Sequence, residues 1–337
     1  MATRHFIYIS TNDGLYRGSL NGGVTELGII GLQGMGTLRA PVVIDYKDPA
    51  TLYVATRRAG VLRSDDAGKT WREMNNGLVY KEVWSIAQHP TTGELYAGTG
   101  PAALFRSKDG GEHWSFSEQL HTLPETIEWT FPNPPHIAHI KGIGLSKTDP
   151  NMVFAAIEEG YLIRSKDGGD TWETLRHGTT IDSHTVNVMP DNPNVLVSAS
   201  GNGIFRSEDL GDHFTLCSTG LTREYVSQIA FHESQPNLLF TAAAAVPPRD
   251  WRRPEGGDTG FFRSDDQARS WRQLNGHGLP DHMVGAPRGT ASFPDQAGTF
   301  LVAMNDGSVW MTMDYGESFA QAVKGLPPVY GITISPN

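Results

Sequence analysis

A Ser-x-Asp-x-Gly segment that ends on an aromatic residue recurs along most of this 337-residue chain. Clear copies begin at Ser64, Ser107, Ser165 and Ser207, and more divergent copies begin at Ser264 and Thr312. A related strand without the full motif surrounds Arg17 and Gly18. The seven units are 42 to 58 residues apart. This spacing is typical of the four-stranded blades of a β-propeller.

Each unit has the pattern of four short strands, named A to D from the axis outward. In the fourth unit these are HIKGIGLS, MVFAAIE, YLIRS and TWETL, separated by Pro- and Gly-containing turns. The first unit has no strand A of its own, and the C-terminal VYGITISP matches the missing pattern. The sequence therefore predicts an all-β, single-domain, seven-bladed β-propeller over residues 1–337. The C-terminal strand closes the first blade, which removes exposed sheet edges.

The repeated motif resembles the Asp-box, or bacterial neuraminidase repeat. Propellers with this repeat include sialidases, xyloglucanase-type glycoside hydrolases, sortilin-like receptors and photosystem-assembly proteins. The resemblance covers nearly the whole chain and implies the propeller fold. It also implies that the box lies on the turn between strands C and D, where its Ser and Asp hold the turn. Asp66 and its equivalents are therefore expected to be structural, and the resemblance selects no single activity.

Composition limits the possible partners. The formal net charge of −10 would repel a phosphate backbone, so no nucleic-acid partner is expected. No apolar run has the length of a secretion signal or a membrane span, so we expect a cytoplasmic protein without membrane contact. Cys217 is the only cysteine, which excludes an internal disulfide.

The departures from the repeat are predicted to share one face of the disc, here called the top face. In a four-stranded blade the B-to-C loops and the connections from D to the next A lie on the same side. The two large insertions, residues 115–139 and 243–259, both fall on such connections. Long loops on one face of a rigid scaffold are common places for binding sites. They also offer a surface for a protein partner.

Ionisable and aromatic residues are concentrated near the starts of the A strands, which surround the central channel, and in the insertions. The candidate substrate-binding residues are Arg39, Trp129, Trp251, His282, Arg288 and Tyr330. Arginine binds carboxylates through paired hydrogen bonds, and aromatic rings offer flat apolar surfaces. Their convergence would indicate a pocket for a small polar or anionic substrate.

The candidate catalytic residues are Glu158, His184, Arg223 and Tyr225. Imidazoles with a carboxylate suit a divalent metal, and the candidate ligands are His136, His139, Glu158 and His184. Without a metal, the same residues suit general acid–base catalysis. His136 and His139 are three residues apart, so in an extended strand only one of them would be a ligand. The alternative is that these histidines cap turns or pack beneath the insertion.

Three hypotheses about function follow. The first is a hydrolase or lyase that acts on a small polar or anionic, carbohydrate-derived substrate, with or without a bound divalent metal. The second is a non-catalytic scaffold or assembly factor that binds a protein through residues 115–139 and 243–259. The third is a glycosidase of the Asp-box type. No organic cofactor is implied.

Overall fold

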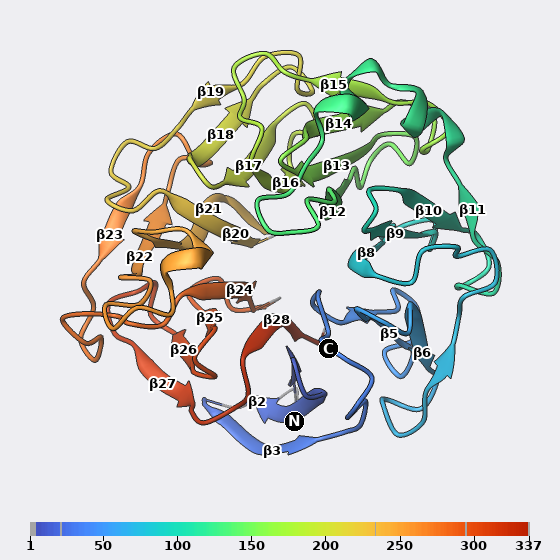
Figure 1. The fold of residues 1–337 in the computed structure, drawn as a ribbon. Coiled ribbons are helices and arrows are strands. Elements are labelled where there is room, and N and C mark those ends of the chain that lie inside the picture. Colours follow the sequence, from blue (N-terminus) through green and yellow to red (C-terminus); the bar gives the residue numbers. More distant parts are fainter. Residues whose placement is uncertain (1–4, 21, 233, 294, 336–337) are drawn as a thin grey trace.

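The computed structural model describes residues 5–20, 22–232, 234–293 and 295–335. Over these residues the chain forms seven four-stranded antiparallel sheets arranged as a ring (Figure 1). The prediction of an all-β, seven-bladed propeller is therefore confirmed. Helix is limited, in the described part of the chain, to three short 3-10 turns: η1 (Glu118–Thr122), η2 (Pro124–Glu128) and η3 (Pro248–Asp250). Nothing among these helical turns has the length needed to cross a bilayer.

In each blade the four strands lie side by side in chain order from the axis to the rim, except that β28 is the innermost strand of blade 1. Blade 1 contains β28 (Val329–Ile334), β1 (His5–Thr11), β2 (Leu15–Leu20) and β3 (Val24–Ile29). Blade 2 contains β4 (Val43–Ile44), β5 (Leu52–Ala55), β6 (Val61–Ser64) and β7 (Arg72–Glu73). Blade 3 contains β8 (Val83–Gln88), β9 (Leu95–Thr99), β10 (Leu104–Ser107) and β11 (Ser115–Phe116). Blade 4 contains β12 (His139–Leu145), β13 (Val153–Glu158), β14 (Tyr161–Ser165) and β15 (Glu173–Leu175).

The remaining three blades have the same order. Blade 5 contains β16 (Ser183–Val188), β17 (Leu196–Ser200), β18 (Gly203–Ser207) and β19 (Thr215–Leu216). Blade 6 contains β20 (Tyr225–His232), β21 (Gln235–Ala244), β22 (Gly260–Ser264) and β23 (Arg272–Leu274). Blade 7 contains β24 (Pro287–Ser292), β25 (Phe300–Met304), β26 (Val309–Thr312) and β27 (Ala320–Val323).

Blade 1 is closed by the two ends of the chain, as the sequence predicts. Strand β28 pairs antiparallel with β1, with Ile7 opposite Ile334 and Ile9 opposite Ile332. In Figure 1 the blue N-terminal strands and the red β28 lie in the same blade. This pairing covers the inner edge of β1 and makes the ring continuous.

The repeated Ser-x-Asp turns tie each blade to its neighbour. In blade 2 the Ser64 hydroxyl donates a hydrogen bond to Asp66 (2.8 Å) and accepts one from the Gly68 amide (2.8 Å). Hydrogen bonds from Thr70 and Ser64 lower the pKa of Asp66 to about 2. Arg63, just before the turn, donates to the carbonyl oxygen of Gly110 in the next turn (3.1 Å). These residues are therefore structural, as expected.

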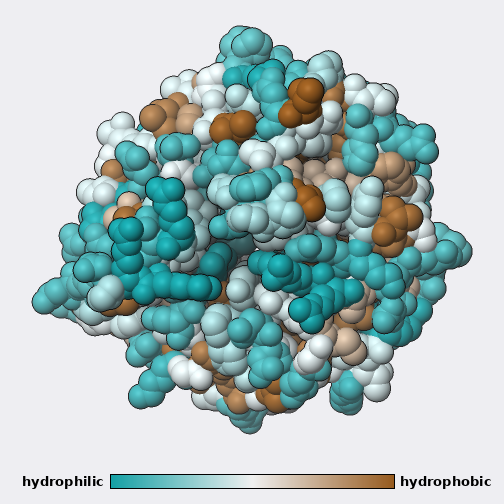
Figure 2. Space-filling view, in the orientation of Figure 1, coloured by the Kyte–Doolittle hydropathy of each residue, from teal (hydrophilic) through white to brown (hydrophobic). Residues whose placement is uncertain are grey.

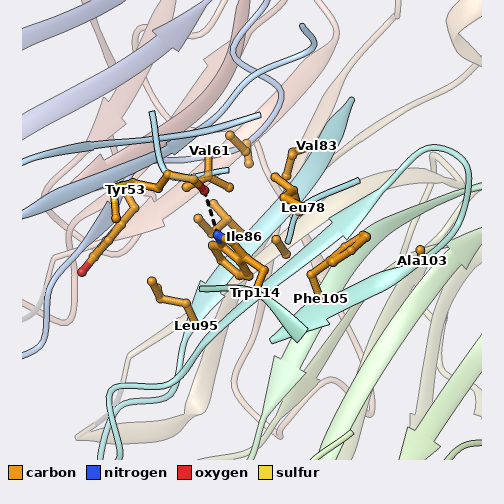
Figure 3. Packing of buried hydrophobic residues seen from close by; sticks show 13 residues of the cluster. Tyr53, Val61, Leu78, Val83, Ile86, Leu95, Ala103, Phe105 and Trp114 are labelled. Carbon is orange, nitrogen blue, oxygen red and sulfur yellow. Dashed lines mark hydrogen bonds between the residues drawn. The ribbon is translucent and has the colours of Figure 1, made fainter. Parts of the chain in front are cut away.

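Apolar side chains fill the spaces between adjacent blades. Between blades 2 and 3, Tyr53 and Val61 pack with Ile86, Phe105 and Trp114 (Figure 3). The Trp114 indole Nε1 donates a 2.7 Å hydrogen bond to the carbonyl oxygen of Met74, drawn as the dashed line in Figure 3. The aromatic residue that ends the motif thus fastens its own blade to the preceding one.

A one-residue β-bulge recurs near the start of the innermost strand in six of the blades. In blade 3, for example, Val83 pairs with Thr99 and Ser85 with Gly98, so Trp84 is an extra residue. The bulge residues in four other blades are Lys141, His184, Arg288 and Tyr330, and in blade 6 the bulge lies between Val226 and Ile229. A bulge redirects a side chain that regular pairing would place elsewhere.

Candidate functional site

The bulges open onto one central cavity of about 720 Å³. Every blade contributes to its wall near the start of the innermost strand, through Tyr330, Arg39, Trp84, Lys141, His184, Ser227 and Arg288 in blade order. Both insertions also line it, with residues 131–133 from the first and 247–249 from the second. In Figure 2 the mouth is a hollow near the middle of the disc with mainly hydrophilic residues around it.

Glu158, at the end of β13, is held by two cationic or polar neighbours. His139 Nε2 lies 2.9 Å from Glu158 Oε2, and Lys141 Nζ lies 2.8 Å from the same oxygen. His139 and Glu158 face each other because they are paired residues of β12 and β13. Burial raises the pKa of Glu158. Lys141, His139 and His184 outweigh this effect and hold the pKa well below its usual value. Glu158 is therefore ionised.

Glu159 follows Glu158 in the chain, and its pKa is shifted in the opposite direction. It turns the chain toward β14 with a φ of 57° and lines the cavity. Its pKa is raised by burial and by the negative charges of Asp182 and Glu158. A left-handed conformation at a residue other than Gly, Asn or Asp is strained, and such strain is common at functional sites. Two adjacent carboxyl groups with pKa values moved apart resemble the arrangement of an acid and a base.

His184 is fully buried, with both ring nitrogens near oxygen atoms. Its Nδ1 donates a 2.7 Å hydrogen bond to the carbonyl oxygen of Val226 in the next blade. Its Nε2 lies 3.0 Å from Asp182 Oδ1, but the geometry does not make a hydrogen bond. The ring of Tyr225 lies 4.8 Å away, centroid to centroid. Burial raises the pKa of Tyr225 well above its usual value, so its hydroxyl stays protonated.

Arg39 and Arg288 lie on either side of Tyr330. The Arg39 guanidinium stacks 4.0 Å above Trp84, and that of Arg288 lies 4.5 Å from the Trp251 ring. Tyr330 is within 5.7 and 5.3 Å of the two cations. Their Nε atoms are buried without a hydrogen bond, and among the described residues neither arginine has a carboxylate within 4.0 Å. Burial is the main cause that lowers the pKa of both.

The structure therefore brings together most of the residues expected from the sequence. Arg39, Glu158, His184, Tyr225, Arg288 and Tyr330 all line the cavity. His139 lies directly behind Glu158, where its ring also stacks on Trp84 at 3.5 Å. Trp251 is buried behind Tyr225 and Arg288, and its indole donates to the carbonyl oxygen of Val246.

Besides His139 and Trp251, four further candidates are not part of the cavity wall. His136 is exposed and its Nδ1 donates to the carbonyl oxygen of Phe131 in the insertion. Arg223 is paired with Asp258 at 2.8 Å, and His282 donates to the carbonyl oxygen of Glu255. Trp129 packs against the apolar core between blades 3 and 4. The structure gives these residues local contacts and does not bring them to Glu158 and His184.

Sequence reasoning left out three cavity residues that matter for its chemistry. The sequence pattern does not select Lys141, it favours a solvated loop position for Glu159, and it places Asp182 near the start of an A strand without a catalytic or metal-binding role. All three line the wall. A signal for Lys141 is present in the sequence. In five blades the bulge residue precedes a small residue, as in Ile140-Lys141-Gly142 and Ser183-His184-Thr185. Aligning the seven units on this pattern would have selected Lys141 together with His184 and Arg288.

Comparisons with known proteins give relatives of two kinds. No family model matches the chain. The photosystem II assembly lipoprotein Ycf48 of Synechococcus sp. (strain CC9902) is 22% identical over 284 residues, which cover 82% of this chain and 76% of that protein. A xyloglucanase from Paenibacillus sp. is 24% identical over 221 residues, which cover 63% of this chain but only 19% of the xyloglucanase.

Solved structures agree on the fold. Ycf48 bound to a D1 peptide superposes with a TM-score of 0.62 at 17% identity, covering 93% of this chain and 89% of that one. The GH74 enzyme of Niastella koreensis superposes with a TM-score of 0.66 at 16% identity, covering 87% of this chain and 46% of that one. These similarities show a shared propeller fold. They connect the chain both to xyloglucanases and to an assembly factor, and they do not choose between them.

Proposed function

We propose that the central cavity is the active site of a hydrolase or lyase that acts on a small anionic, carbohydrate-derived molecule. The observation that carries this proposal is the pair Arg39 and Arg288. Both face the cavity without a carboxylate partner, opposite the ionised Glu158 and the adjacent Glu159.

The two arginines favour an anionic ligand. A partly buried charge without a partner is costly, whereas a charge-assisted hydrogen bond to a carboxylate satisfies it. Lys141 differs from them because Glu158 already neutralises it. The aromatic rings beneath the guanidinium groups fix their planes but leave the N–H edges free for a ligand. Arg39, Arg288 and the Tyr330 hydroxyl therefore form the anion-binding side of the cavity.

The opposite side has the groups needed for proton transfer. His184 Nδ1 carries a proton, because it donates to a carbonyl oxygen. In the neutral ring Nε2 therefore has the lone pair and can accept a proton from the substrate or from water. Glu159, whose pKa is raised, keeps its proton to higher pH and is the acid. In a hydrolase the base activates water while the acid protonates the leaving oxygen. In a lyase the base removes a carbon-bound proton beside the carboxylate, and the acid protonates the oxygen as the C–O bond breaks.

Binding and turnover test this proposal separately. Isothermal titration with galacturonate and with uncharged galactose should show binding of the acid only, and Arg39→Met should abolish it. Oligogalacturonides should then be cleaved, and the ultraviolet absorbance of an unsaturated product distinguishes a lyase from a hydrolase. Xyloglucan and a sialoside belong in the same screen, because cleavage of either would favour the Asp-box glycosidase. Equal affinity for acid and neutral sugar would contradict an anion site.

A protein-binding scaffold is the second candidate, favoured by exposed apolar residues in the first insertion. Ile127 of η2 is 90% exposed and Ile137 is 45% exposed. The likeness to Ycf48 bound to a D1 peptide is consistent with this function. Capture of a partner that survives Arg288→Met but is lost with Ile127→Ser would support a scaffold. Retention of the partner by Ile127→Ser together with turnover in the cavity would exclude it.

A further inference from the structure

We propose that Asp182, His184 and Glu158 bind a divalent transition-metal ion such as Mn²⁺ or Zn²⁺. One ligand atom from each side chain lies within 4.8 Å of the other two. The three come from different parts of blades 4 and 5: the end of β13, the connection before β16, and the bulge of β16. The site shares the cavity of the proposed function and uses the same Nε2 atom of His184, so a bound ion would replace the proton-accepting role of that nitrogen.

The contacts of His184 leave Nε2 without a hydrogen bond beside a carboxylate. A carbonyl oxygen only accepts hydrogen bonds, so the 2.7 Å contact with Val226 makes Nδ1 the protonated nitrogen. In a neutral ring Nε2 then has a lone pair, which faces the Asp182 carboxylate 3.0 Å away. Two acceptors at this distance repel. A metal ion between them would turn the repulsion into two ligand bonds, and it would also explain why this buried nitrogen has no hydrogen bond.

The separation of His184 and Asp182 and the chemistry of the three donors suit such an ion. Two ligands at about 2.1 Å from a metal and at right angles to each other, as in octahedral coordination, are about 3.0 Å apart, which is the separation of His184 Nε2 and Asp182 Oδ1. Imidazole with carboxylates suits a first-row transition metal better than Ca²⁺ or Mg²⁺, which prefer oxygen ligands alone. A metal-bound histidine usually donates its other ring N–H to a carboxylate, a backbone carbonyl or a water, and His184 has such a contact with Val226.

This ligand set differs from the one expected from the sequence. His136 lies outside the cavity, and the Nε2 atom of His139 is directed at Glu158 Oε2. Asp182 takes their place. Lys141, on the same Glu158 oxygen, is a competing cation. Lys141 therefore provides a second test: its removal should strengthen metal binding, whereas removal of a ligand should weaken it.

The experiment is calorimetric titration of chelator-treated, dialysed protein with MnCl₂ and with ZnCl₂. We expect one equivalent to bind. Asp182→Asn should weaken binding at least about 100-fold, because loss of a direct ligand exceeds the 10- to 100-fold typical of outer contacts. Lys141→Met should strengthen binding at least about 10-fold, because it removes a like charge near the ion. His136→Ala is the matched control, and its affinity should be unchanged.

Two results would overturn the metal site. One is no binding of either ion by the wild-type protein at millimolar concentration. The other is equal affinity of the wild type, Asp182→Asn and Lys141→Met, each with an unchanged melting temperature that shows intact folding. Galacturonate titration of the chelated protein keeps the two proposals apart. Carboxylate binding without metal binding would leave the arginine site standing, and metal binding without carboxylate binding would leave only the cation site.

Discussion

Replacing Arg288 by Met should stabilise the unliganded protein while destroying anion binding. The guanidinium has no carboxylate partner among the described residues, so its desolvation is not compensated by an ion pair, a term of several kcal/mol. Contacts with the rings of Trp251 and Tyr330 return about 0.5–2 kcal/mol, and Met retains part of that contact. The net gain is about 1–3 kcal/mol, which corresponds to a rise in melting temperature of about 2–6 °C.

The same substitution removes two charge-assisted hydrogen bonds to the ligand. Each contributes about 1.5–3 kcal/mol, so affinity for galacturonate should fall at least about 100-fold. Differential scanning calorimetry and isothermal titration measure the two effects. Arg263→Met is the matched control, because Arg263 lies 5.2 Å from the Tyr315 ring and its Nε donates to Asp265 at 2.8 Å. Arg263→Met should not raise the melting temperature and should leave the affinity for galacturonate unchanged. A lower melting temperature with unchanged galacturonate affinity for Arg288→Met would refute the reasoning.

Three further predictions concern the scaffold. Three carboxyl groups of the Ser-x-Asp turns, those of Asp66, Asp109 and Asp209, have pKa values of about 2 in the folded protein. Their contribution to stability is fully present above about pH 4, near the pKa of the unfolded chain, and is lost as the pH falls toward 2. Melting temperatures should therefore decline across this range, and should decline less after Asp→Asn changes at these three residues. Trp114→Phe removes the hydrogen bond to Met74 and should lower the free energy of unfolding in urea by about 1–2 kcal/mol; an unchanged midpoint would contradict the inter-blade role. Gly142→Ala places a Cβ 2.7 Å from the carbonyl oxygen of His184 and should lower the free energy of unfolding by about 1–3 kcal/mol in the same assay; an unchanged midpoint would contradict the close approach of adjacent inner strands.

The fold could be predicted because its signals are local and repeated. The Ser-x-Asp turns fixed the spacing of the blades, and VYGITISP matched the strand missing from blade 1, where β28 now pairs with β1. Blade 4 shows how far this extends, since all four of its strands, β12 to β15, fall within the predicted segments.

The site was predicted less well because its geometry depends on bulges. In a regular strand, side chains alternate between faces, so parity decides which residues share a wall. One extra residue shifts that parity, and it brings Lys141 and His184 to the cavity. Asp182 reaches His184 through a turn whose shape has no sequence rule. His136 and His282 were grouped with the site by position alone, and the structure gives them other partners.

The central claim is that side chains from all seven blades converge on one cavity whose basic side binds an anion. A crystal structure of the protein grown with galacturonate tests it most directly. The account predicts density for the sugar acid in the cavity, with its carboxylate between Arg39 and Arg288 and its ring toward His184 and Glu159. An occupied cavity whose ligand carboxylate contacts neither arginine, or a ligand bound only outside the ring, would contradict it.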